Sequence, residues 1–133
     1  MNRFSARAVI LVLVALVAIA IAVAGCGGSA GPAITEVGAT EAVEMLDSRV
    51  VIDVRTPAEY AAGHIVGAQN IDVEAADFGS KIALLDKEAP YLVYCHSGRR
   101  SGNAATQMAS AGFTDIVDGG AMADLVAAGA PTQ

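Results

Sequence analysis

Cysteine and histidine, the usual ligands of structural zinc, are scarce in this sequence of 133 residues. It contains two cysteines, Cys26 and Cys95, and two histidines, His64 and His96. Structural zinc sites use four such ligands at short characteristic spacings, and neither residue type recurs here at such a spacing. The sequence therefore excludes a cysteine-based metal site, and we expect the protein to need no metal and no other cofactor.

Basic residues are also few. The chain has eight lysines and arginines against 14 aspartates and glutamates, which gives a formal net charge of −6. Nucleic acids and anionic lipid surfaces are bound chiefly through clustered positive charge. We therefore expect no nucleic-acid partner.

Charge is absent from one long stretch, residues 8–24, which follows Arg3 and Arg7. A basic start followed by an apolar run is typical of a secretory signal peptide. The run ends in VAGC, residues 23–26, which resembles the lipobox of bacterial lipoproteins. The resemblance implies cleavage before Cys26 and attachment of lipid to that thiol and to the new amino group. An uncleaved anchor helix is the alternative.

On the lipoprotein interpretation, residues 1–25 are a signal peptide, residues 26–33 a lipidated linker and residues 34–133 the folded domain. The domain is then expected outside the cytoplasm, tethered to the membrane through Cys26, because several acyl chains together hold stably where one does not. Cleavage removes two basic residues and leaves a formal net charge of −8, from six basic and 14 acidic residues. Cys95 becomes the only free thiol, which excludes an intramolecular disulfide and leaves a reactive, intermolecular or buried cysteine.

Beyond the linker, segments with strand and helix patterns alternate. Compact apolar runs predict strands, and apolar residues at helical spacing predict helices. This alternation is typical of an α/β fold in which helices flank a parallel sheet, with sites where strand carboxyl ends meet helix amino ends. The predicted strands are residues 34–37, 50–54, 68–72, 91–95 and a segment through Ile116 and Val117, and the predicted helices are residues 40–47, 57–62, 78–85, 100–111 and 120–128.

Cys95 ends the predicted strand YLVYC, and the loop CHSGRR follows directly. If this loop curls around the sulfur, the backbone N–H groups of residues 96–101 form an anion-binding nest, to which the helix amino end adds positive potential. Gly98 allows a backbone conformation that a side chain would resist, and Arg99 and Arg100 add full positive charges. These features favour the thiolate, which is the nucleophilic form. A plain core cysteine is the alternative, but it would not require the glycine and the paired arginines.

Three segments together resemble the rhodanese family of single-domain sulfurtransferases: DVRTPAEYAAGHIVGAQNI, VYCHSGRRSGNAA and AGFTDIVDGG. The resemblance implies a small α/β domain with a parallel five-stranded sheet. It also implies that Cys95 is the catalytic residue, which takes the outer sulfur of a donor such as thiosulfate and passes it to cyanide or a thiol. This is covalent catalysis by an activated nucleophile, with a persulfide between the two steps. One departure is the lack of tryptophan, which the family often carries after the glycines at 119–120.

The length of the loop separates this chemistry from a related one. Cysteine-dependent phosphatases place an arginine six positions after the nucleophile, where this chain has Ser101. The shorter loop resembles the version that handles sulfur. We expect His96 to face the pocket mouth, and Arg99 and Arg100 to supply local positive charge for an anionic donor. The full set of expected substrate-binding residues is His96, Ser97, Gly98, Arg99, Arg100 and Ser101.

Three further residues are expected to support the site. The resemblance implies that Asp53 and Arg55 brace the active-site region, and a structural salt bridge between them is as good an interpretation as contact with substrate. Glu59 fits the N3 position of a capping box with Thr56, and support of the site is its second interpretation. His64 matches a family position regarded as architectural, with a catalytic base as the alternative.

Two functions from different classes fit these patterns. The first is an extracytoplasmic, membrane-tethered sulfurtransferase that carries sulfur on Cys95. The second is a non-catalytic rhodanese-fold module that binds a partner or senses thiols at the cell envelope. Retention of Cys95, Gly98 and both arginines favours the enzyme, because an inactive relative would not need a thiolate.

Overall fold

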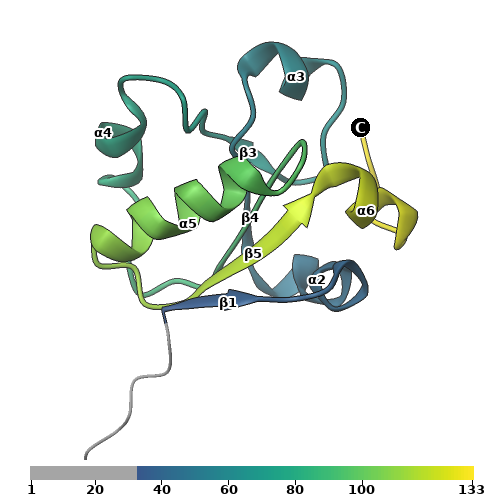
Figure 1. The fold of residues 1–133 in the computed structure, drawn as a ribbon, viewed down its shortest axis with the longest axis horizontal. Coiled ribbons are helices and arrows are strands. Elements are labelled where there is room, and N and C mark those ends of the chain that lie inside the picture. The colour runs from purple at the N-terminus through teal and green to yellow at the C-terminus, as the bar shows by residue number, and fades with distance from the viewer. Residues whose placement is uncertain (1–32) are drawn as a thin grey trace, which may run out of the picture. The chain divides into compact units, whose positions relative to one another are not determined.

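The computed structural model describes residues 33–133, in which strands and helices alternate (Figure 1). The strands are β1 (Ile34–Glu36), β2 (Val50–Asp53), β3 (Gln69–Asn70), β4 (Tyr91–Cys95) and β5 (Ile116–Ala121). The helices are α2 (Ala39–Met45), α3 (Pro57–Ala61), α4 (Phe78–Ile82), α5 (Arg99–Ser110) and α6 (Met122–Ala127), and the 3₁₀ helix η1 (Leu46–Ser48) follows α2.

The predictions for the amino-terminal segment concern residues 1–33, almost all of which precede the described part of the chain. The predicted signal peptide, the predicted lipidation site Cys26 and all of the predicted linker except Ala33 lie outside the described residues. Within residues 33–133, every helix is too short or too polar to cross a membrane. The rest of this subsection concerns residues 33–133 alone.

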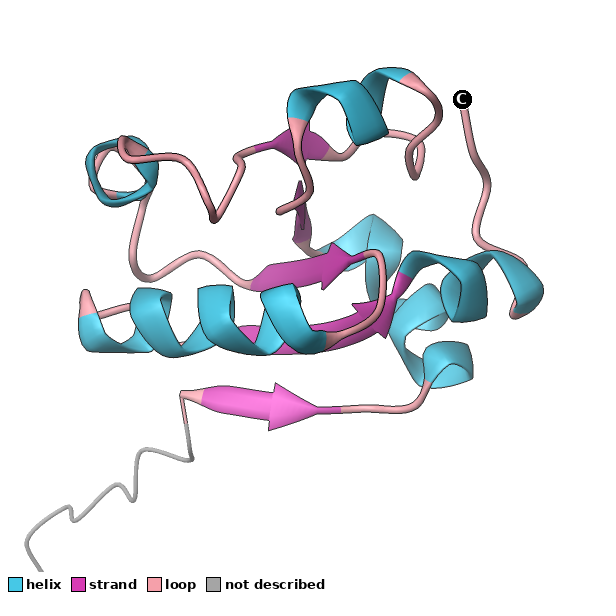
Figure 2. Cartoon of the chain, turned by 45° about the horizontal axis from the view of Figure 1, so that its top comes forward, coloured by secondary structure: helices cyan, strands magenta, loops and turns pink. Residues whose placement is uncertain are grey.

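The five strands form one sheet in the order β1-β5-β4-β2-β3, and all four neighbouring pairs are parallel. Parallel neighbours need crossover connections, and here the crossovers carry the helices. Figures 1 and 2 show α5 lying along the sheet over β4 and β5. The predicted α/β fold with a parallel five-stranded sheet is confirmed.

Each face of the sheet has its own apolar core, because successive strand residues point to opposite sides. On the central strand β4, Leu92 and Tyr94 belong to the core that includes residues of α2 and α6. Val93 and Cys95 belong to the other core, which includes residues of α4 and α5. All five residues of β4 are buried, as expected for a strand covered on both faces. This places Cys95 beneath α5 at the carboxyl end of the innermost strand.

β5 is longer than predicted at its carboxyl end. The predicted helix over residues 120–128 is wrong for its first two residues, which continue the strand. The reason is a close approach that local pattern does not reveal: a Cβ at Gly119 would lie 2.9 Å from the Leu92 side chain. The register of β4 and β5 shifts there, so that Cys95 pairs with Ala121. The glycine pair thus lets β5 run alongside the cysteine.

The other predicted elements are confirmed, with differences at their ends. β3 is shorter than the predicted strand because it is an edge strand that pairs only with β2. The start of α3 follows the predicted capping box, in which the Thr56 hydroxyl accepts from the Glu59 N–H and the Glu59 carboxylate accepts from the Thr56 N–H. Helix α5 begins at Arg99, one residue earlier than predicted.

Candidate active site

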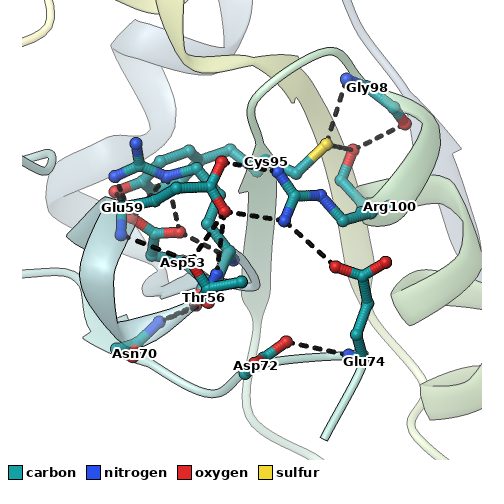
Figure 3. A network of polar contacts seen from close by, with 12 residues as sticks. Asp53, Thr56, Glu59, Asn70, Asp72, Glu74, Cys95, Gly98 and Arg100 are labelled. Carbon is teal, nitrogen blue, oxygen red and sulfur yellow. Dashed lines mark hydrogen bonds and ion pairs between the residues drawn. The ribbon is translucent and has the colours of Figure 1, made fainter.

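Cys95 is fully buried, and its sulfur faces polar groups of the loop that follows it (Figure 3). The Gly98 N–H donates to Sγ at 3.0 Å, and the Ser101 hydroxyl lies 3.7 Å from the same atom. The Ser101 hydroxyl in turn donates to the Gly98 carbonyl at 2.9 Å. The sulfur therefore sits inside a small polar ring, although the rest of its side chain belongs to the apolar core.

The loop conformation depends on Gly98. Its φ of +89° lies in the left-handed region, as the sequence predicted, and this conformation turns its N–H toward the sulfur. The expectation that several amides would converge on the sulfur is met in part. Within residues 33–133, the Gly98 amide is the one that lies at hydrogen-bond distance from Sγ. The Gly98 amide, at the amino end of α5, thus directs its positive partial charge at the sulfur.

The two arginines of the loop have different surroundings. Arg99 is exposed and forms no ion pair within residues 33–133, whereas Arg100 is half-buried. The Arg100 guanidinium forms ion pairs with Glu59 at 2.7 Å and with Glu74 at 3.3 Å. The positive charge expected from both arginines is therefore offset at Arg100 by two carboxylates, and only Arg99 adds an uncompensated cation to the loop.

Glu59 joins the start of α3 to the start of α5. Its carboxylate accepts from both terminal nitrogens of Arg100, at 2.8 and 2.7 Å, and from the backbone and hydroxyl of Thr56. The hydrogen bonds from Arg100, followed by those from Thr56, lower the pKa of Glu59 to about 2 against the opposing effect of desolvation. The predicted capping box is confirmed, and the same carboxylate also binds a loop arginine, while a role of Glu59 in supporting the site stays a prediction.

Hydrogen bonding to Glu59 raises the pKa of Arg100. The negative charges of Glu74 and of an ionised Cys95 act in the same direction. Arg100 therefore stays protonated at any pH at which the protein folds. Arg100 also lies in the loop between Gly98 and Ser101, whose amide and hydroxyl contact the sulfur.

Asp53 and Arg55 form a buried salt bridge below the loop. Asp53 is fully buried, and its carboxylate accepts from the Arg55 backbone at 2.9 Å and from the guanidinium at 2.6 to 3.0 Å. The Tyr94 hydroxyl donates to the same carboxylate at 2.7 Å and accepts from the Ile65 N–H at 3.0 Å. Because Tyr94 precedes Cys95, this network holds β2, β4 and the loop after α3 together. The salt bridge predicted between Asp53 and Arg55 is present, and their role in bracing the active site stays a prediction.

Comparison with known proteins identifies the family. The family model described as a rhodanese-like domain matches residues 38–123. This range includes the buried cysteine, its loop and the salt bridge beneath it. The chain belongs to the rhodanese-like domain family.

Relatives of this rhodanese-like chain carry names that describe an activity. The thiosulfate sulfurtransferase GlpE of Pseudomonas fluorescens is 47% identical over 74 residues, which cover 53% of this chain and 65% of the relative. The protein of the same name from Pseudomonas putida is 44% identical over 77 residues, which cover 56% of this chain and 67% of the relative. The chain thus spans slightly less than two thirds of the length of the first of these curated relatives.

Solved structures support the same family. The rhodanese-like domain of an Anabaena protein superposes with a TM-score of 0.65 at 27% identity, covering 77% of this chain and 79% of that one. A structure described as rhodanese with anions from E. coli has a TM-score of 0.55 at 32% identity, covering 64% of this chain and 96% of that one. This rhodanese-like domain therefore has the same fold as these two solved structures.

The two histidines of the rhodanese-like domain lie in different settings. His64 stacks on Tyr60 with 3.6 Å between ring centroids, and its Nδ1 donates to the Tyr60 carbonyl at 3.0 Å. Its Nε2 lies 3.0 Å from the Gln133 amide nitrogen, which donates to it. These contacts are those of an architectural histidine, as predicted. His96 and Ser97 are exposed in the loop, so their roles in substrate binding remain predictions.

Sequence reasoning missed Glu74 and Asn70. Glu74 reaches Arg100 from the segment between β3 and α4, 26 residues away in sequence. The Asn70 side chain donates to the carbonyls of Asp53 and Arg55 at 3.1 and 2.8 Å and so fixes β3 to the end of β2. Neither residue belongs to a local sequence motif, because each makes its contacts with residues that are distant in the sequence.

Proposed function

We propose that this protein is a sulfurtransferase that takes sulfur from a donor such as thiosulfate and carries it on Cys95 as a persulfide. The observation that carries the proposal is the position of the Cys95 sulfur, at the end of the central strand and hydrogen-bonded by the Gly98 amide. Membership of the rhodanese-like family and the names of the two Pseudomonas relatives support it.

In the first step, neighbouring groups move to admit the donor, and the Cys95 thiolate attacks the outer sulfur of thiosulfate. A bond forms between the two sulfurs while the sulfur–sulfur bond of thiosulfate breaks. The bonding electron pair leaves with sulfite, and the product on the protein is a persulfide anion. The Gly98 N–H and the amino end of α5 stabilise negative charge at the cysteine before and after the transfer.

In the second step, an acceptor attacks the terminal sulfur of the persulfide. Cyanide forms a carbon–sulfur bond and leaves as thiocyanate, or a thiolate forms a new persulfide. The electron pair of the broken bond returns to the Cys95 sulfur, which is again a thiolate. The substrates are therefore a small sulfur-containing anion and a thiophilic acceptor, cyanide or thiol.

Intact mass tests this proposal. The purified full-length protein, incubated with thiosulfate and freed of excess reagent, should gain one sulfur atom, and peptide mapping should place it on Cys95. Cyanide should then remove it. Protein alkylated with iodoacetamide beforehand serves as the control and should gain nothing. An unmodified mass after thiosulfate would contradict the proposal.

One observation favours a second function. The Cys95 side chain has no solvent-exposed surface, so a donor reaches the sulfur only after neighbouring groups move. A non-catalytic module that binds a partner through its exposed loop residues would not need such access. The mass measurement separates the two functions, because a binding module would not take up sulfur.

We also propose that the domain is held at the outer face of a bacterial membrane by lipid on Cys26. The support comes from the sequence, in which VAGC ends an uncharged run preceded by two arginines. Cys26→Ala, or treatment with globomycin, should make the uncleaved precursor accumulate, because lipidation precedes cleavage at such sites. Gel mobility and membrane fractionation measure this. Unchanged size and fractionation under both treatments would exclude the lipid anchor.

A further inference from the structure

Arg100 holds two carboxylates that differ in how firmly they are fixed. Glu59 lies 2.7 and 2.8 Å from the two terminal nitrogens of the guanidinium, whereas Glu74 reaches one of them at 3.3 Å. Figure 3 shows the guanidinium bonded to Glu59 on one side and to Glu74 on the other. The contact of Arg100 with Glu74 is therefore longer than its contact with Glu59, and it uses one guanidinium nitrogen where the contact with Glu59 uses two.

The surroundings of the two carboxylates also indicate that Glu74 is held less firmly than Glu59. The Glu59 carboxylate also accepts from the backbone and hydroxyl of Thr56, so helix α3 fixes its position. The Glu74 side chain is 57% exposed, and within residues 33–133 Arg100 is its only hydrogen-bond partner. An exposed ion pair of this kind adds little stability, because water and salt compete for both charges. Glu74 can leave the guanidinium at small cost, whereas Glu59 cannot.

We propose that Glu74 occupies the place on Arg100 that an oxygen of the incoming anionic donor takes, and that it is displaced when the donor binds. The inference rests on the proposed sulfurtransferase function and assigns Glu74 a part in donor specificity. With both carboxylates in place, the three groups carry a net charge of −1, which opposes a dianionic donor. Departure of Glu74 makes the pair of Arg100 and Glu59 neutral and frees an N–H donor of the guanidinium for an oxyanion.

Two variants of the full-length protein separate this role from a general effect of charge. Glu74→Gln removes one negative charge from the contact with Arg100. Asp77→Asn removes one negative charge from the ion pair with Lys81, in which Asp77 is 58% exposed, so its exposure matches that of Glu74. Both variants change the net charge of the protein equally, and within residues 33–133 Asp77 forms no hydrogen bond or ion pair with the loop. Asp77→Asn is therefore the matched control.

The first measurement does not depend on sulfur transfer. It compares the alkylation rates of Cys95 by iodoacetate, which is anionic, and iodoacetamide, which is neutral, with peptide mapping to identify the modified cysteine. Glu74→Gln should raise the ratio of the two rates about twofold to fivefold, the range that an exposed ion pair can control. Asp77→Asn should leave the ratio unchanged. Equal ratios in all three proteins would overturn the role of Glu74.

The second measurement is the KM for thiosulfate with cyanide as acceptor. Glu74→Gln should lower this KM by a similar factor with little change in kcat, and Asp77→Asn should change neither. An unchanged or increased KM in an active Glu74→Gln protein would overturn donor displacement. A raised alkylation ratio in a protein that takes up no sulfur would instead overturn the sulfurtransferase function and leave Glu74 as a residue that excludes anions.

Discussion

Cys95→Ser should abolish sulfur transfer, with a loss of at least about a thousandfold in kcat, as is usual when a covalent nucleophile is removed. A serine hydroxyl does not ionise near neutral pH, and the Gly98 amide cannot compensate for the much weaker acidity. Steady-state thiocyanate formation from thiosulfate and cyanide measures the loss. The variant should also gain no sulfur after incubation with thiosulfate.

The same substitution should leave the fold intact. The serine oxygen can accept the hydrogen bond that the Gly98 N–H now gives to the sulfur, so the change introduces no unpaired polar group. Ala105→Ser is a matched control, because it places a hydroxyl at a fully buried position of the same apolar core while retaining the thiol. The control should keep its activity. Activity of Cys95→Ser near that of the control would show that sulfur travels on another residue.

Asp53→Asn should lower the free energy of unfolding by about 3–5 kcal/mol, the usual effect of removing one partner from a buried ion pair. Asp53 is fully buried, and its carboxylate accepts from Arg55 and from the Tyr94 hydroxyl. An amide of the same shape leaves the Arg55 charge without its counter-ion. A small domain is stable by only about 5–15 kcal/mol, so this substitution should remove a large part of the free energy of unfolding.

Asp115→Asn is the control for burial. Asp115 forms an ion pair with Arg49 at 2.6 Å, the same distance as between Asp53 and Arg55, but its side chain is 49% exposed. Loss of this ion pair should lower the free energy of unfolding by at most about 1 kcal/mol, because solvent screens an exposed pair. Urea denaturation followed by circular dichroism measures both variants. Equal losses would mean that the Asp53 network does not hold β2 and β4 together.

The sequence predicted the features that depend on neighbouring residues. The alternation of apolar runs and helical spacing indicated an α/β fold with a parallel sheet, which the structure confirms. The capping box at Thr56 was also predicted, as was a backbone conformation at Gly98 that a side chain would resist, because each is decided within one turn of the chain. Cys95 was identified for the same reason, since strand, cysteine and glycine loop are contiguous.

Local patterns failed where two distant segments meet. The end of β5 was assigned to a helix because nothing in its own sequence shows that it must pass within contact distance of Leu92. Arg100 was expected to be available to substrate, but the fold brings Glu59 and Glu74 to it from 41 and 26 residues away. The charge of a single residue does not reveal its counter-ion.

The sequence by itself thus determined the architecture and indicated Cys95 and its loop as the candidate site, because these depend on hydrophobic periodicity and on short contiguous motifs. Only the tertiary structure decided which carboxylates pair with the loop arginine Arg100. Strand order and register place Glu59, Glu74 and Arg100 at one edge of the sheet and join Asp53 to Tyr94 across β2 and β4. Ion pairing falls off steeply with distance, so the electrostatics of the site exist only once these long-range contacts form.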